Sequence, residues 1–194
     1  MPLDLPSVRG NHDRYLVEQT PSAMHHWEAD AFAQLDDRHL AWLGGLPPSL
    51  VWRDEVFLCH ATPADDNRYW LEAVSPAGHV HLKPMAEIEA LAEGVAQPLI
   101  LCGHSHLPRA VRLSDGRLIV NPASVGCPAY DDVTPYPHKV EAGSPFASYA
   151  IIERTGGVWV PTFRQVAYDH VAMARLATTR GREDWARALS TGWL

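Results

Sequence analysis

Apolar residues follow regular spacings along the chain, and these spacings predict an alternation of helices and strands. Residues 24–35 carry apolar side chains every three or four positions, which is typical of an amphipathic helix. A second short helix, 36–44, has an aspartate N-cap and ends at two glycines and two prolines. Residues 84–94 have a proline in the first turn and a glycine past the end. Residues 169–189 predict two short helices broken at Gly181.

Short apolar runs bounded by turn residues predict β-strands. One such run, residues 2–8, leads into the sequence GNHD, and another, 98–102, leads into GHSH. Residues 61–82 and 127–146 show no periodicity and are predicted to be long loops, a kind of segment that is more often functional than idle in a domain. Strand pairs are expected around the turns Arg53-Asp54-Glu55, Ser114-Asp115-Gly116 and Thr155-Gly156-Gly157.

The charge of the chain narrows the classes of partner. The formal net charge is −7, and the 16 Lys and Arg residues are scattered rather than clustered, which argues against a nucleic-acid partner. Three cysteines form no disulfide framework, and no segment has the pattern of a membrane span or a signal peptide. We therefore expect a cytoplasmic protein without a nucleic-acid or membrane partner.

Potential metal ligands follow three of the predicted strands. In a layered α/β protein the carboxyl ends of strands converge on the ligand site, so these side chains are expected to meet. Imidazole, amide oxygen and carboxylate together suit Mn²⁺, Fe²⁺, Zn²⁺ or Ni²⁺. The residues are Asn11, His12, Asp13, His60, His104 and His106.

The same residues also have ordinary structural interpretations. Asn11 alone is typical of a helix cap or turn, His60 of a core histidine, and Asn121, which precedes a proline, of a turn. A structural zinc site built on Cys59, Cys102 and the nearby histidines is disfavoured, because adjacent strand residues such as Cys59 and His60 point to opposite faces.

Four motifs together make the metal-site interpretation specific. They are GNHD at 10–13, CHATP at 59–63, GHSH at 103–106 and NPASVG at 121–126. In order and approximate spacing they resemble the later motifs of the calcineurin-like metallophosphoesterases, most of all the small bacterial members. The resemblance covers nearly the whole chain. It implies an α/β fold, a layered β-sandwich flanked by helices, in a single domain 1–194 that is incomplete at its N-terminus.

The resemblance also implies a metal site with two divalent ions. Asn11, His60 and His104 would bind the second metal, and His106 would bind the first. A water molecule between the ions would lose a proton near neutral pH and attack phosphorus in line, while both ions stabilise the phosphoryl oxygens.

Two further pairs of residues receive roles in the same way. His12 would be the catalytic acid that protonates the leaving oxygen, and Asp13 would hold its ring. Asn121 and Ser124 match the loop that supports the site.

The family pattern opens with two motifs that do not precede Gly10 in this chain. A strand ending in D-x-H and a second ending in G-D-x-x-D supply the first metal and the bridging aspartate, and Asp4 has no companion histidine at the right spacing. Two strand–helix units, on the order of 60 residues if each takes about 30, are therefore expected upstream of Met1. The chain alone is expected to bind at most one metal ion.

These motifs imply a hydrolase of phosphate mono- or diesters, with a small phosphorylated molecule or a phosphoprotein as its substrate. A non-catalytic scaffold or binding protein on the same fold, as in a retromer subunit, stays open as an alternative, and so does an inactive fragment. His12 favours the enzyme, because a scaffold has no use for a proton donor beside the metals. The missing motifs favour the scaffold only if the chain is complete.

Overall fold

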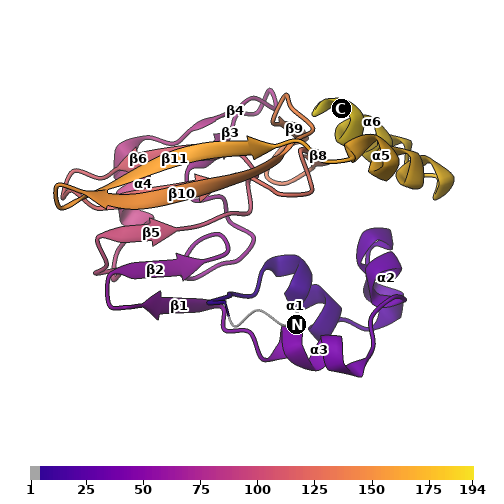
Figure 1. The fold of residues 1–194 in the computed structure, drawn as a ribbon, viewed down its shortest axis with the longest axis horizontal. Helices are drawn as coiled ribbons and strands as arrows, with labels where there is room; N and C mark the ends of the chain where they lie inside the picture. Colours follow the sequence, from indigo (N-terminus) through magenta and orange to yellow (C-terminus); the bar gives the residue numbers. More distant parts are fainter. Residues whose placement is uncertain (1–4) are drawn as a thin grey trace.

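A five-stranded mixed sheet forms the centre of the computed structural model, which describes residues 5–194. The three inner strands are parallel, and each edge strand is antiparallel to its neighbour. Because parallel neighbours share a direction, the inner strands all end at the same edge of the sheet (Figure 1). Across the sheet the order is β1 (Ser49–Trp52), β2 (Val56–Cys59), β5 (Leu99–Leu101), β7 (Leu118–Pro122) and β6 (Pro108–Arg112).

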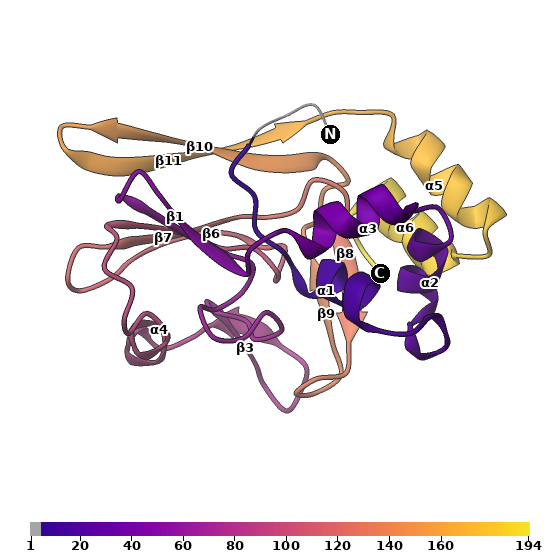
Figure 2. The same cartoon turned by 90° about the horizontal axis from the view of Figure 1, so that it is seen from below.

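The two faces of this sheet are covered by different elements (Figure 2). Alternate residues of a strand point to opposite faces, so Leu99 faces one cluster of apolar side chains and Ile100 the other. On the first face, a long hairpin made of β10 (Ala147–Thr155) and β11 (Val158–Val166) packs through Ile152 and Trp159. On the second face, α4 (Met85–Leu91) packs through Ile88. The result is a layered arrangement with apolar residues between the layers.

The remaining helices gather beyond the edge at which the inner strands end (Figure 1). The N-terminal helices and the C-terminal helices contact each other there, since the centroids of the Trp27 and Trp185 rings lie 6.4 Å apart. No helix within residues 5–194 has the length and apolar character needed to cross a membrane. The helices are α1 (Asn11–Glu18), the 3-10 turn η1 (Pro21–Ala23), α2 (His26–Phe32), α3 (Asp37–Gly44), α5 (His170–Thr179) and α6 (Glu183–Thr191).

The structure confirms the predicted α/β class, the three hairpins and the break between the last two helices. At the first hairpin, residues 53–55 join the paired Trp52 and Val56. Arg53 and Asp54, both with positive φ of 53° and 58°, are the central residues of the turn that the Glu55 N–H closes on the Trp52 carbonyl at 3.2 Å. The helix predicted at 24–35 is shorter and covers only His26–Phe32.

Both segments predicted to be loops contain a short hairpin instead. Their strands have only three or four residues and mix polar with apolar side chains, so they leave little signal in the sequence. Glu72, for example, is buried because it pairs with Arg109 at 2.7 Å, a contact between distant segments. The hairpins are β3 (Glu72–Val74) with β4 (Val80–Leu82), and β8 (Ala129–Asp132) with β9 (His138–Glu141).

The strand predicted at residues 2–8 does not form in residues 5–8, the part of it that the structure describes. Residues 5–9 have no regular structure, and Arg9 makes a single backbone bond, from its N–H to the Pro47 carbonyl at 2.9 Å. Pro6 has no N–H to give to a neighbouring strand. The remainder of the predicted strand, including Asp4, lies outside the described residues.

Candidate metal centre

The predicted site residues meet at the edge of the sheet where β2, β5 and β7 end. His60 follows β2 directly, and His104 follows β5 after a short turn. Their rings lie 5.1 Å apart between centroids. The third contribution comes from the first turn of α1, which lies beside this edge (Figure 1). The convergence of strand ends predicted from the sequence is therefore present in the fold.

Asn11 is held at the site by the start of α1. Gly10 is the N-cap residue of this helix, and its N–H donates to the Asp13 carboxylate at 2.8 Å, which is one half of a capping box because glycine has no side chain to accept a bond in return. Gly10 also packs closely against the His60 ring, since a Cβ at this position would lie only 2.9 Å from His60 Nδ1. A glycine is thus required here for space rather than for backbone conformation, because its φ is −92°.

Two polar atoms of the site are buried without a partner. Asn11 Oδ1 and His60 Nε2 are both shielded from solvent and accept or donate no hydrogen bond to any residue of the described chain. Burial lowers the pKa of His60 to about 3, and the neighbouring His104 and His106 add to this lowering. His60 is therefore neutral at physiological pH, and a neutral imidazole is the form that binds metals.

The two histidines of GHSH are fixed in opposite tautomers. His104 Nε2 lies 2.9 Å from the Asn67 carbonyl, and His106 Nδ1 lies 3.0 Å from the Cys127 carbonyl. A carbonyl only accepts, so each of these nitrogens carries the proton. Burial lowers the pKa of both rings, that of His106 to about 4, and the neutral rings keep lone pairs on His104 Nδ1 and His106 Nε2. Carbonyl groups that accept the proton of one ring nitrogen orient metal-binding histidines in this way.

The backbone of GHSH is strained at the same two residues. His104 and His106 have φ values of 67° and 56°, in the left-handed region that non-glycine residues rarely adopt. Asn121 holds the turn in place: its amide nitrogen donates to the Gly103 carbonyl at 2.7 Å and to Ser105 Oγ at 2.9 Å. Strain of this kind persists only where the surroundings fix it, and it is common at functional sites.

Ser124 supports the site through one intermediate residue. Its hydroxyl accepts a hydrogen bond from the Cys127 N–H at 3.0 Å, and the Cys127 carbonyl is the group that orients His106. Asn121 and Ser124 therefore contact the GHSH turn and the segment that carries the Cys127 carbonyl, and their supporting role stays a prediction.

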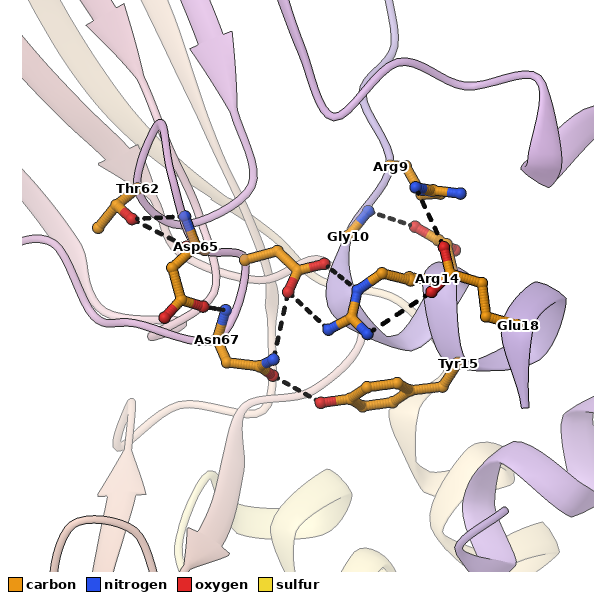
Figure 3. Close-up of polar contacts among 10 residues, drawn as sticks. Arg9, Gly10, Arg14, Tyr15, Glu18, Thr62, Asp65 and Asn67 are labelled. Atoms are coloured by element: carbon orange, nitrogen blue, oxygen red, sulfur yellow. Dashed lines mark hydrogen bonds and ion pairs between the residues drawn. The ribbon is translucent and has the colours of Figure 1, made fainter. Parts of the chain in front are cut away.

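The first part of the segment predicted as a loop, 62–69, connects α1 to the GHSH turn. Arg14 donates two hydrogen bonds of 2.7 Å to the Asp66 carboxylate, and Tyr15 donates to the Asn67 side chain at 2.6 Å (Figure 3). The Asn67 carbonyl then receives the His104 proton. This link has no signal in the sequence, because its last step uses a backbone carbonyl that any residue supplies.

The partner of the His12 ring differs from the one predicted. The Asp13 carboxylate caps α1 through Gly10, and the group against His12 Nδ1 is instead the Glu28 carboxylate of α2. Asp13 points back along its own helix, because a residue at the third helical position is placed to bond the N-cap N–H. Glu28 was missed because one glutamate in an amphipathic helix carries no sequence signal.

The donors present fit a metal ion with mixed nitrogen and oxygen ligands. Asn11 Oδ1 and His60 Nε2 have no protein partner in the described range, and the contact at His104 Nε2 leaves the lone pair of that ring on Nδ1. Residues 5–194 contain no group of three His, Cys, Asp or Glu side chains arranged to hold a metal ion, and the unpartnered oxygen at this site belongs to the Asn11 amide. The letters D-x-H do occur at 37–39, but they form the exposed first turn of α3 rather than a strand end.

Comparison with known proteins supports the fold and goes no further. No family model matches the chain, and no curated protein matches it. A crystal structure of a metallophosphoesterase from Sphaerobacter thermophilus matches with a TM-score of 0.68 and 23% identity, covering 96% of this chain and 76% of that one. A Vps29 single mutant from Entamoeba histolytica (TM-score 0.35, 14% identity, 63% of each chain) and vacuolar protein sorting 29 from Cryptosporidium parvum (0.30, 12%, 63% and 58%) are too distant to carry an argument. The chain therefore has the fold of a metallophosphoesterase.

Proposed function

We propose that the chain is a phosphoesterase of the calcineurin-like group that depends on a divalent metal ion. The observation that carries the proposal is the pair of buried, unpartnered atoms, Asn11 Oδ1 and His60 Nε2, beside the oriented lone pair of His104. Each unsatisfied buried group costs about 1–3 kcal/mol. Unsatisfied groups of this kind are expected where they bind a ligand, and coordination of a cation would remove the energetic cost.

Four residues would hold metal ions at this edge of the sheet. Asn11, His60 and His104 form one donor set, and His106 offers its Nε2 lone pair towards a second ion. A bound divalent ion supplies a lowered pKa for water and positive charge for the phosphoryl oxygens of the substrate. Amide and imidazole donors favour Mn²⁺, Fe²⁺, Zn²⁺ or Ni²⁺.

His12 would give a proton to the leaving oxygen of the ester. Its side chain is 64% exposed, unlike the other histidines of the site, and the Glu28 carboxylate occupies one ring nitrogen. The second ring nitrogen is therefore the one that would meet substrate. We place phosphate mono- or diesters of small molecules or phosphoproteins as substrates, since the net charge of −7 offers no surface for nucleic acid.

Metal content and hydrolysis test the proposal together. Purified protein is loaded with Mn²⁺ or Zn²⁺, the ions per chain are counted by elemental analysis, and bis-p-nitrophenyl phosphate hydrolysis is followed with Mn²⁺. We expect one ion per chain, because the single imidazole of His106 cannot hold a second ion against water and buffer. We further expect loss of that ion in His60→Ala, its retention in the exposed control His81→Ala, and hydrolysis above that of Mn²⁺ alone. Equal metal content in parent and His60→Ala would contradict the metal site. Metal binding without hydrolysis would favour the non-catalytic scaffold.

A further inference from the structure

Glu28 is a buried carboxylate that the proposed chemistry leaves without a role. It lies in α2, its exposure is only 4%, and the hydrogen-bond partner that the structure describes for it is His12 Nδ1. Buried glutamates are rare unless paired, because removing a charge from water is costly. Here the partner is an exposed ring at the metal site, so the pairing does more than neutralise an internal charge.

The contact determines which nitrogen of His12 carries the proton. When the Glu28 carboxylate is ionised it only accepts hydrogen bonds, and Nδ1 is then the donor in this contact. A neutral His12 ring then has its lone pair on Nε2, the opposite corner of the imidazole. The Glu28 end of this hydrogen bond is buried, where the attraction is stronger than in water, so the contact favours one orientation of the more exposed ring.

We propose that Glu28 is a positioning residue for His12, fixing the Nδ1–H tautomer and turning Nε2 toward the substrate in the reaction proposed above. The inference rests on that proposed function for its kinetic consequence, but the tautomer itself does not depend on it. After His12 gives its Nε2 proton to the leaving oxygen, the ring is neutral with its remaining proton on Nδ1. Glu28 stabilises both the charged ring and this neutral tautomer.

The position of Glu28 depends on the C-terminal helices. Trp27, its neighbour in α2, packs against Trp185 of α6 at 6.4 Å between ring centroids, and the Arg182 guanidinium lies 4.8 Å from the Trp27 ring. A cation over an indole face is worth about 0.5–1 kcal/mol at an exposed site. The end of the chain therefore holds the helix that orients a histidine near its beginning.

The tautomer is measured directly by ¹H–¹⁵N NMR of histidine ring nitrogens at a pH where His12 is neutral. His12 is one of 11 histidines, and its signals are assigned by their loss in His12→Gln. We expect an Nδ1–H ring in the parent and in Glu28→Gln, whose amide oxygen still accepts the proton. Glu28→Ala should lose the Nδ1–H preference, and the control Glu18→Gln, on the outer face of α1, should keep it.

Kinetics then separate positioning from a merely structural contact. Glu28→Ala should lower kcat about 10- to 100-fold on a poor leaving group, much less on a p-nitrophenyl ester, and Glu28→Gln should restore part of the loss. In the His12→Ala background the same change should have no further effect. A merely structural role would instead lower kcat equally on both substrates, and this loss would add to the loss caused by His12→Ala.

The outcomes are distinguishable. An unchanged tautomer in Glu28→Ala overturns the inference whether or not the chain hydrolyses esters. If Glu28→Ala does not fold, Glu28→Asp, which keeps the charge but withdraws it by one methylene, replaces it with the same expected loss of the tautomer. Inactivity of the parent with the tautomer change intact would contradict the proposed function and leave the Glu28 contact established.

Discussion

Gly10→Ala tests the packing of the site with a single methyl group. The backbone at Gly10 is extended, with φ −92° and ψ 174°, so alanine meets no conformational barrier there. Its Cβ would stand 2.9 Å from His60 Nδ1, 3.0 Å from Cε1 and 3.2 Å from Cγ. These distances are shorter than carbon and nitrogen tolerate, so the His60 ring must move. Overpacking of this kind costs about 1–3 kcal/mol.

The cost should appear mainly in metal binding. In the metal-free chain the ring can swing away from the new methyl group, whereas coordination requires it to return. A penalty of about 1–3 kcal/mol corresponds to a weakening of roughly 5- to 150-fold in metal affinity. Calorimetric titration with Zn²⁺ measures this change. Unfolding should be affected less, because replacing glycine returns about 0.4–1 kcal/mol through the unfolded chain.

Gly44→Ala is the matched control for this prediction. Its Cβ would lie 3.5 Å from Val17 Cγ1, an ordinary contact, and it sits at the end of α3 where alanine is a better helix former. We expect unchanged metal affinity and slightly higher stability. Equal Zn²⁺ affinities for Gly10→Ala and the parent would refute the argument that the Gly10 surface sets the position of His60.

Three shorter predictions concern stability. The free energy of unfolding should fall as pH drops from about 6.5 toward 4. The cause is that His60 takes up a proton in the unfolded chain but stays neutral in the folded one, where burial lowers its pKa to about 3. Urea titrations at several pH values should show a shallower fall for His60→Gln. Asp66→Asn breaks the partly exposed bidentate pair with Arg14, and it should cost about 1 kcal/mol and speed proteolysis of segment 62–69. Tyr69→Phe removes a half-buried hydroxyl with two partners and should cost about 1–3 kcal/mol by thermal melting, whereas Tyr149→Phe on the exposed hairpin should cost little.

The parts of the fold that the sequence predicted are those whose signal is local. The turn at Arg53-Asp54 and the glycine turn at 156–157 flank apolar runs long enough to show the strand period. The short hairpins β3–β4 and β8–β9 carry no such period, because their burial depends on partners such as Arg109 that are distant in sequence. Helix α1 begins inside the GNHD motif, so the residues of its first turn carry the signal of the motif rather than that of a helix.

The site shows the same division between local and distant signals. The motifs marked the residues that converge, and the structure brings Gly10, His60 and His104 together. The residues that orient them were found only in the fold. Asn67 acts through a backbone carbonyl, and Glu28 is an unremarkable helical glutamate until α2 is placed against α1. A sequence pattern identifies a ligand by its side chain, whereas the orienting partner is fixed by tertiary contacts.

These contacts connect the proposed metal ligands to the loops around them. Segment 62–69 is tied to α1 through Arg14 and to the GHSH turn through the Asn67 carbonyl, so it fixes the helix that carries Asn11 and the tautomer of His104 at once. A change in this segment that suits a different substrate would therefore also move Asn11 and His104, two of the three residues proposed to bind one metal ion. The strained backbone of His104 needs close support from its neighbours. Substitutions in segment 62–69 that change substrate specificity should therefore also change metal affinity.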